Sequence, residues 1–423
     1  MMKGLFDIIQ YVLGLGPSLM MPIIITVLGL VLGQKLSRSI RSGLFVGFGF
    51  IGINLLVGLM WGALSGASQA MVKRFGLQLT AVDMGWPVAA AITWALPLSA
   101  VVILVAVGLN LVLLGMRWTK TLNIDIWNIW HYAYVTALTV AVTKSPALGL
   151  VAGGLYSVIY LKLADWTAPA YQEVFDLPGV SCTTGSVTEL APIAYLIDRV
   201  VDRIPVVGKL SADPASIKDR FGPLGEPPIM GFILGAVIGL LAGFNLKDIG
   251  NLAMNMGATL LILPRMVELL MEGLVPISEA AKELLSKRFA GRDVYIGMDA
   301  ALAIGHPAAM STALIMIPIT LALAVILPGN KVLPFVDLAA MPFFMIFGLA
   351  FGRGNIVRGV INGTIFMIIA LYGATWFAPL VTQVGVQAGY KLPEGATTIT
   401  QLGTGLHWIG IALVKIAQII AGT

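Results

Sequence analysis

Residues 300–330, AALAIGHPAAMSTALIMIPITLALAVILPGN, contain no Asp, Glu, Lys or Arg. A charged side chain at the centre of a bilayer costs roughly 2.5 to 3.5 kcal/mol on insertion scales, so a long uncharged run is typical of a membrane segment. A helix needs about 20 predominantly apolar residues to cross the hydrocarbon core. This stretch is long enough to span a bilayer, and it decides the class of protein.

Similar uncharged runs recur along the chain. Together with the first they make about eleven apolar segments, at residues 11–34, 42–72, 84–116, 126–143, 145–161, 227–246, 249–264, 300–330, 338–352, 359–390 and 395–414. We therefore predict an all-α polytopic membrane protein with about eleven transmembrane segments. The run 42–72 is dense in glycine and the run 359–390 is overlong, which favours re-entrant hairpins or broken helices there.

The composition of the 423 residues agrees with this class, because 58% are hydrophobic and 11% are charged. Soluble domains are about a quarter charged, so a water-soluble enzyme is excluded. The net charge of +5 forms no concentrated basic face, so we expect no nucleic-acid partner. The single cysteine, Cys182, rules out an internal disulfide and a Cys-based zinc cluster. There is no Walker or dinucleotide motif, and we expect no cofactor and no metal.

Charge gathers in one long hydrophilic loop, where ten charged residues lie between Asp198 and Glu226. Within a single permease domain, 1–423, we expect this loop to separate two transmembrane halves. The predicted parts are an N-terminal half, 1–197, the loop, 198–228, and a C-terminal half, 229–423.

Three smaller features bear on topology. The polar stretch 278–293, SEAAKELLSKRFAGRD, predicts a short amphipathic helix at an interface. Lys35 and neighbouring arginines follow the first apolar run, so the positive-inside rule places the N-terminus outside; it carries no signal-cleavage site, and we expect it to be retained. The stretches 21–34 and 341–353 share a Met-Pro and a Gly-Leu spacing, a match short enough to arise by chance.

Polar residues inside apolar runs are candidates for function, because they are expensive in a membrane. In residues 122–135, LNIDIWNIWHYAYV, Asp125, Asn128 and His131 recur at helical spacing, with Trp127 beside them. Carboxylate and amide groups can bind sugar hydroxyls while indole faces cover the C–H surface. The alternative is the start of a helix at the membrane interface, with Asp125 near the N-cap.

A second candidate pair is Asp299 and His306 in residues 294–318, VYIGMDAALAIGHPAAMSTALIMIP. Their spacing of seven puts both on one helix face, unless His306-Pro307 marks a break that turns freed backbone groups toward a ligand. The structural alternative makes Asp299 a helix N-terminal residue at the interface and His306 a packed histidine.

A third candidate is the loop 177–198, LPGVSCTTGSVTELAPIAYLID, which is rich in Ser, Thr and Gly. Thr184, Ser186 and Thr188 can offer hydroxyls to a polyol, with Glu189 as a strong acceptor. The alternative is an ordinary helix start, with Ser186 or Thr188 as N-cap and Glu189 in the first turn.

Asp83 is the fourth candidate, in QLTAVDMGWPVAAAITW at residues 78–94. It lies just before an uncharged run, where it is either a helix cap at the membrane surface or a carboxylate in a cavity. The sequence leaves both alternatives open.

Four long stretches carry a resemblance to a known family. They are LGPSLMMPIIITVLGLVLGQKLSRSIRSGLFVGFGFIGINLL (15–56), LNIDIWNIWHYAYV (122–135), TGSVTELAPIAYLIDR (184–199) and YIGMDAALAIGHPAAM (295–310). With them the chain resembles the galactitol-specific IIC permeases of the bacterial phosphoenolpyruvate-dependent phosphotransferase system, which are similar to the ascorbate IIC permeases. The resemblance implies an inner-membrane homodimer, each protomer with a scaffold domain and a mobile core domain that moves as an elevator.

The resemblance also implies a division of labour. Galactitol enters from the periplasm, and a phosphocysteine on a separate IIB subunit, recharged through IIA, phosphorylates it on release inside. The chain itself is then a transport subunit and carries no phosphoryl-transfer chemistry. The main alternative is a proton- or sodium-coupled secondary transporter of a polyol or sugar, with Asp299 or Glu189 as the titrating group.

Site residues follow from the resemblance position by position. An acidic residue in a segment like GMDAALA lies at the substrate of the ascorbate relatives, and Asp299 holds the matching position. The stretch with His131 and the loop 184–189 match other substrate-facing segments. The ascorbate-type pattern has histidine and glutamine where this chain has Trp127, Gly185 and Ser186, a departure that suits a neutral polyol.

Overall fold

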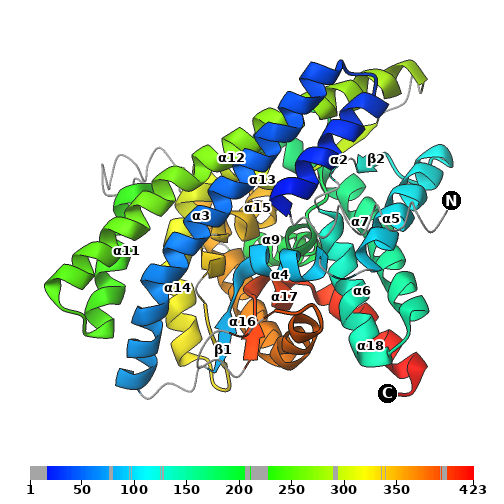
Figure 1. The fold of residues 1–423 in the computed structure, drawn as a ribbon. Helices are drawn as coiled ribbons and strands as arrows, with labels where there is room; N and C mark the ends of the chain where they lie inside the picture. Colours follow the sequence, from blue (N-terminus) through cyan, green and yellow to red (C-terminus); the bar gives the residue numbers. More distant parts are fainter. Residues whose placement is uncertain are drawn as a thin grey trace.

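The computed structural model describes most of the chain. The described residues are 17–75, 80–94, 96, 98–123, 125, 128–204, 210, 227–288, 294–334, 336–338, 340–390, 392 and 398–423. Within them the chain is almost entirely helical, with six very short strands (Figure 1).

The elements fall into two series with the same order. The first series is α2 (Pro17–Val31), α3 (Leu36–Phe75), β1 (Ala81–Asp83), α4 (Gly85–Trp94), α5 (Leu98–Gly115), β2 (Thr121–Asn123), α6 (Ile129–Thr143), α7 (Pro146–Phe175), β3 (Val180–Cys182), α8 (Gly185–Thr188) and α9 (Ala191–Asp202). The second series is α11 (Pro227–Ala242), α12 (Leu246–Arg288), β4 (Tyr295–Met298), α13 (Ala301–Ile304), α14 (Pro307–Ile326), β5 (Val332–Leu333), the 3₁₀ turn η3 (Val336–Leu338), α15 (Met341–Phe351), α16 (Ile356–Gln387), β6 (Thr398–Thr400), α17 (Leu402–Leu406) and α18 (Trp408–Ala421).

The two series exchange their strands. One sheet has the order β5-β1-β6 and the other β2-β4-β3, and all pairs are parallel. The first strand of each series therefore lies between the second and third strands of the other series. This exchange relates the two sheets to one another and fastens the two series together.

Helices α7 and α16 carry the repeat most clearly in sequence. Each begins with a capping side chain, since Ser145 accepts from the amide of Leu148 and Asn355 accepts from the amide of Val357. The residues that then agree at a constant offset are Gly149 with Gly359, Gly153 with Gly363, Trp166 with Trp376 and Pro169 with Pro379. The stretches 21–34 and 341–353 lie in α2 and α15, which hold different places in the two series, so their likeness is no part of this repeat.

Helices α2, α3, α11 and α12 form a layer of long helices across one side of the molecule (Figure 1). Their backbones come very close, since a Cβ added to Gly273 would lie 2.5 Å from the Ser42 carbonyl oxygen. Glycines of the run 42–72 serve the same close contact, since a Cβ added to Gly43 would lie 2.3 Å from the Pro22 carbonyl oxygen. Helix α3 is one continuous helix where we expected breaks. The short amphipathic helix predicted for 278–293 is also wrong. Its residues up to Arg288 continue α12, on which Glu279 forms an exposed ion pair with Arg38 of α3.

The core lies in the rest of the molecule, around α6 and α15. Both helices are buried on nearly all sides, the pattern of a helix at the centre of a bundle. Large aromatic side chains fill the space around them, namely Trp130, Tyr132, Tyr134, Tyr156, Tyr160, Tyr171, Phe347 and Phe366. Tyrosine and tryptophan each need a polar partner when they are buried, so this core is arranged to carry polar groups.

Three described helices, α7, α14 and α16, are long and apolar enough to cross a membrane by length and composition. Shorter apolar helices occur within α5, α11, α15 and α18. The structure thus agrees with a helical membrane protein, while the number of eleven spans stays a prediction. The overlong run 359–390 forms most of α16, a single helix with Pro379 inside.

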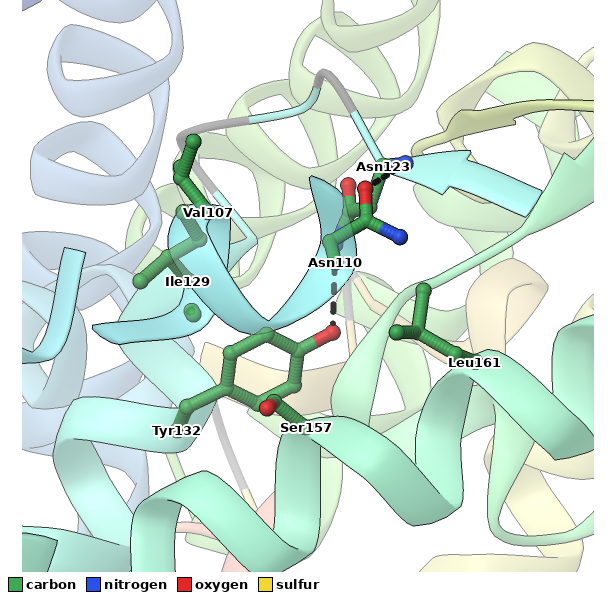
Figure 2. Close-up of a pocket in the computed structure, with 8 residues that line it drawn as sticks. Val107, Asn110, Asn123, Ile129, Tyr132, Ser157 and Leu161 are labelled. Atoms are coloured by element: carbon green, nitrogen blue, oxygen red, sulfur yellow. Dashed lines mark hydrogen bonds between the residues drawn. The ribbon is translucent and has the colours of Figure 1, made fainter. Parts of the chain in front are cut away.

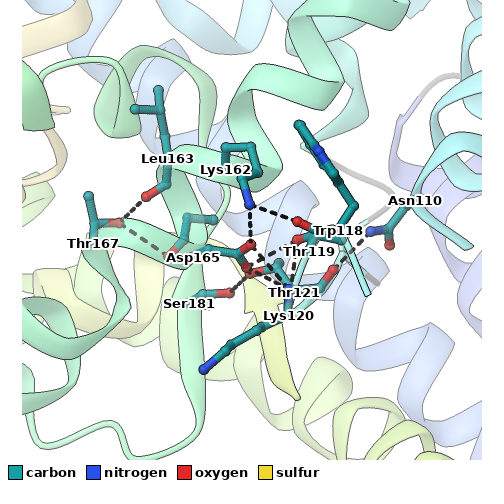
Figure 3. Close-up of polar contacts among 11 residues, drawn as sticks. Asn110, Trp118, Thr119, Lys120, Thr121, Lys162, Leu163, Asp165, Thr167 and Ser181 are labelled. Carbon is teal, nitrogen blue, oxygen red and sulfur yellow. Dashed lines mark hydrogen bonds and ion pairs between the residues drawn. The ribbon is translucent and has the colours of Figure 1, made fainter. Parts of the chain in front are cut away.

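Asp165 on α7 anchors the sheet that carries β2. Its carboxylate accepts from the hydroxyls of Thr119 and Thr121, at 3.1 and 2.8 Å, and from the amide of Lys120 at 3.0 Å (Figure 3). Thr121 in turn lies 3.0 Å from the hydroxyl of Ser181 on β3. Charge-assisted hydrogen bonds of this kind fix β2 and β3 against α7, and with them the residues that follow each strand.

Candidate functional site

The carboxyl ends of three parallel strands bring together the residues that matter most. Asp125 and Asn128 follow β2, Thr184 follows β3 and Asp299 follows β4. Because the strands are parallel, these ends meet at one edge of the sheet, the place where ligands bind in other folds with parallel strands. The separate sequence predictions for Asn128, Thr184 and Asp299 thus converge on one cluster.

Asn128 is the centre of this cluster. Its amide nitrogen donates to Asp125 Oδ2 at 3.1 Å and to Thr184 Oγ1 at 3.2 Å, and the side chain also lies within reach of Asp299. Thr184 Oγ1 accepts from the amide of Ala300 at 2.8 Å. The amide oxygen of Asn128 is buried and has no hydrogen-bond partner among the described residues. A strong acceptor therefore stays free at the middle of the cluster.

Asp299 is the carboxylate of the cluster that is open to a ligand. Its Oδ1 accepts from the amide of Ala301 at 2.6 Å, which fixes its position at the start of α13. Asp299 is only half-buried, whereas Asp125, Asn128 and Thr184 are buried. A half-buried carboxylate beside a free amide oxygen is suited to accept hydrogen bonds from hydroxyl groups.

The sheet β5-β1-β6 carries an aspartate pair, Asp83 and Asp337, at the equivalent positions. Backbone amides of the protein already donate hydrogen bonds to both carboxylates. Asp83 accepts from the amides of Gly85 and Asp337, both at 3.1 Å. Asp337 accepts from the amides of Trp86, at 2.8 Å, and Gly403, at 3.2 Å. Both carboxylates are fully buried. The bond to Gly85, which opens α4, matches the capping alternative for Asp83 and gives it a part in the framework around the site.

His131 lies on α6 within a chain of buried polar groups. Its Nδ1 is 3.2 Å from His407 Nε2, and His407 Nδ1 is 2.7 Å from the hydroxyl of Tyr156. Tyr156 also donates to Glu189, whose second oxygen accepts from the amide of Ile409 at 2.9 Å. This series of hydrogen-bonded side chains links α6, α7 and the start of α18 to Glu189, the residue after α8. Glu189 is thus paired entirely within the protein fold.

The first turn of α8 joins the histidine chain to the Asn128 cluster. A Cβ added to Gly185 would lie 2.1 Å from His131 Cγ, so the imidazole packs directly on this turn. Only glycine fits at this position, directly after Thr184. Ser186 is buried on the same turn, and Thr188 donates to the Cys182 carbonyl at 3.2 Å. Of the loop residues predicted as ligands, Thr184 and Ser186 keep a little exposed surface, whereas Thr188 and Glu189 are fully buried.

His306 occupies the break between two helices. α13 ends at Ile304 and α14 begins at Pro307, with His306 Nδ1 accepting from the amide of Ala308 at 3.2 Å. The alternative of a break at His306-Pro307 is therefore confirmed, and the shared helix face with Asp299 is wrong because Pro307 starts a new helix. The imidazole of His306 packs edge-to-face with the ring of Phe175, with 5.3 Å between ring centres. Trp127 lies outside the described residues.

One further expectation, that of a shared helix face for Asp125 and Asn128, is wrong, and several partners in the site were not predicted. Asp125 and Asn128 precede α6, so they meet through a turn and not through a helix face. His407, Gln401 and Tyr156 were not predicted, although His407 and Gln401 interrupt the apolar run 395–414 and Tyr156 interrupts a run of aliphatic residues. Within the described residues no three His, Cys, Asp or Glu side chains gather to hold a metal ion.

A small polar pocket lies beside the cluster, behind β2. Asn110, Asn123, Tyr132 and Ser157 line its polar part, and Asn123 donates to the Tyr132 hydroxyl at 3.1 Å (Figure 2). Its cavity volume of about 10 Å³ is room for about one water molecule. The pocket is too small for a sugar. Its role is to hold β2, since Asn123 also accepts from the amide of Asp125.

Comparison with known proteins points in one direction. The family model described as "PTS system sugar-specific permease component" matches residues 11–395. The chain is 38% identical over 404 residues to the protein named PTS system galactitol-specific EIIC component from Escherichia coli K12, covering 95% of this chain and 90% of the relative; the protein of that name from E. coli O157:H7 gives the same values. It is also 38% identical over 396 residues to a putative permease IIC component from E. coli K12, covering 94% and 91%.

Proposed function

Because this chain belongs to the family of sugar-specific permease components of the phosphotransferase system, we propose that its sugar is galactitol. The chain is the membrane permease subunit of such a system, and it works with the system's other components. Galactitol is the substrate that the name of the E. coli relative states. The observation that carries the proposal is the cluster of Asn128, Thr184 and Asp299 at the carboxyl edge of one sheet.

The chemistry of this cluster suits an uncharged polyol. Each hydroxyl of galactitol can donate to an acceptor, and the cluster offers two, the half-buried Asp299 carboxylate and the amide oxygen of Asn128, which has no partner among the described residues. A hydrogen bond to a charged group contributes roughly 1.5 to 3 kcal/mol. We assign direct contacts to Asp299, Asn128, Thr184, Ser186, His131 and Trp127. Glu189, Thr188, Asp83 and His306 then hold the backbone around the ligand.

Phosphorylation belongs, in this proposal, to a separate IIB subunit with a phosphocysteine that IIA recharges. Supporting this division, Cys182 is fully buried and its sulfur lies 3.6 Å from the Thr188 hydroxyl. A fully buried thiol is a poor nucleophile, because burial disfavours the reactive thiolate form and keeps reactants away from the sulfur. The permease then binds and moves the polyol, and the partner performs the chemistry.

For transport we propose an elevator movement in a homodimer within the inner membrane, with the N-terminus outside. The layer of α2, α3, α11 and α12 is the scaffold, and the remaining helices with both sheets are the mobile core. In support, a small apolar cluster joins the layer to β5 and η3. It consists of Ala67, Met71, Ile238, Leu252 and Met256 packed against Leu333 and Val336. A small, apolar contact of this kind can slide at low cost.

The direct test is binding of galactitol to the purified permease and to Asp299→Asn. We expect the variant to lose at least tenfold in affinity, since the amide keeps the size of the carboxylate but accepts hydrogen bonds less strongly. The matched control is Asp176→Asn, an exposed aspartate at the end of α7, which should bind normally. Normal galactitol binding by a folded Asp299→Asn protein would refute the assigned site.

A further inference from the structure

Gln401 is buried without any use for its side chain in the fold. It lies between β6 and α17, is fully buried, and makes no capping bond to the helix that it precedes. Both its amide oxygen and its amide nitrogen have no hydrogen-bond partner among the described residues. Among the described residues, Gln401 is the only buried side chain with two polar atoms that lack a hydrogen-bond partner. A buried amide that satisfies neither group is unfavourable unless something binds there.

The surroundings of Gln401 offer no structural partner in its place. The Tyr134 hydroxyl lies near, but it is already paired with Thr404 Oγ1 at 2.7 Å. Asp337 is also near, but it accepts from the amides of Trp86 and Gly403. These neighbours have partners of their own, and the Gln401 amide, although within reach of the Tyr134 hydroxyl, makes no well-formed hydrogen bond with it.

Gln401 lies beside the contact between α17 and α8, which hold equivalent places in the two series. A Cβ added to Gly403 would lie 3.0 Å from Gln401 Oε1 and 3.6 Å from Ser186 Cβ. Gly403 on α17 thus packs closely against both Gln401 and Ser186 on α8, and a larger side chain at 403 would press on Gln401. Ser186 is two residues from Thr184, which belongs to the Asn128 cluster. The free amide and the cluster therefore flank the same turn of α8.

We propose that Gln401 is a further ligand of the polyol, which is held between Asp299 on one side of the site and α17 on the other. This inference rests on the proposed function, because it concerns the same ligand. An amide presents a donor and an acceptor together, so it can bind two adjacent hydroxyl groups, each of which both donates and accepts. The neutral oxygen of Gln401 also favours a hydroxyl over a phosphate or carboxylate, which has no hydrogen to donate.

The test uses the purified full-length permease and Gln401→Met, which keeps the length of the side chain and removes both polar groups. Binding is measured calorimetrically for galactitol and for both enantiomers of its 1-, 2- and 3-deoxy analogues, which together cover every hydroxyl because galactitol is a meso compound. We expect Gln401→Met to lose about tenfold or more in galactitol affinity. At least one deoxy analogue that binds weakly to the unmodified protein should bind the variant as well as galactitol does.

Matched variants separate this role from a structural one. Gln383→Met, at an exposed glutamine of α16, should leave galactitol affinity and the deoxy pattern unchanged. If Gln401→Met does not fold, Gln401→Asn, which keeps the amide but shortens its reach, should show the same loss.

Three outcomes decide the matter. A folded Gln401 variant with near-normal affinity and the same deoxy pattern overturns the inference, as does a variant that is only less heat-stable. Failure of the unmodified protein to bind galactitol overturns the proposed function instead.

Discussion

At the scale of single residues, the site depends on polar side chains that serve one another as partners. The sequence predicted Asp299, Asn128 and Thr184, because polar groups in uncharged runs stand out. It did not predict His407 or Gln401, since periodicity along one segment carries no information about a partner 276 residues away, the separation of His131 and His407. The roles of His407 and Gln401, in the second series, therefore follow only from the structure, in which the two series face each other.

His407 is a positioning residue for His131, and its removal should be measurable. His407→Phe takes away the bonds to His131 and Tyr156 and leaves buried polar groups without partners. We expect a loss of roughly 1 to 3 kcal/mol in unfolding free energy, measured as lowered thermal stability in detergent. Galactitol affinity should fall as well.

The control for this variant is Ile416→Phe, an exposed position on the same helix. It should leave thermal stability and binding unchanged. An unaltered melting temperature for His407→Phe would contradict the positioning role.

At the scale of elements, the strand ends and helix breaks place the site, and these were only partly predictable. The break at His306-Pro307 followed from proline chemistry. The continuity of α3 could not be predicted, because its glycines suggest breaks until the close contact between Gly43 and the Pro22 carbonyl is known. The pairing of β1 with β5 and β6 was equally hidden, since strands of three residues leave little signal in sequence.

An ion-pair cluster fastens α9 to the start of α16. Arg358 is buried and pairs with Asp198, and its second nitrogen lies 2.6 Å from Asp202. Replacing Arg358 with Met leaves the buried Asp198 unpaired, so we expect a destabilisation of roughly 3 to 5 kcal/mol, measured by denaturation in detergent. Lys415→Met, at an exposed site on α18, is the control and should cause no loss. Equal stability of the two variants would show that the cluster does not fasten α9.

The same cluster gives a direction for the effect of pH. The hydrogen bond from Arg358 holds the pKa of Asp202 below its ordinary value. A carboxyl with a lowered folded-state pKa stabilises the fold above its unfolded pKa, and that contribution disappears as the pH falls through the folded value. The difference in stability between the protein and Arg358→Met should therefore shrink in acid, below about pH 4.

At the scale of the whole molecule, the layer of long helices carries a row of exposed apolar side chains. On α3 they recur at helical spacing, namely Leu44, Phe48, Ile51, Leu55 and Leu59. We expect this row to lie at the contact between protomers. Leu55→Cys should therefore form cross-linked dimers in membranes, whereas Trp376→Cys, which is equally accessible but lies on α16 outside the layer, should not. The native Cys182 is buried and adds no background. Cross-linking through position 376 alone would place the interface on the core.

The central claim is that this permease delivers galactitol as a phosphate ester, and the fate of labelled galactitol tests it most directly. Right-side-out vesicles that contain the permease, its IIA and IIB partners, enzyme I and the phosphocarrier protein are supplied with phosphoenolpyruvate or with a proton gradient. We expect labelled galactitol phosphate to accumulate inside only with phosphoenolpyruvate, and Asp299→Asn to abolish it. Free galactitol accumulating on the gradient alone would contradict the account and support a coupled secondary transporter.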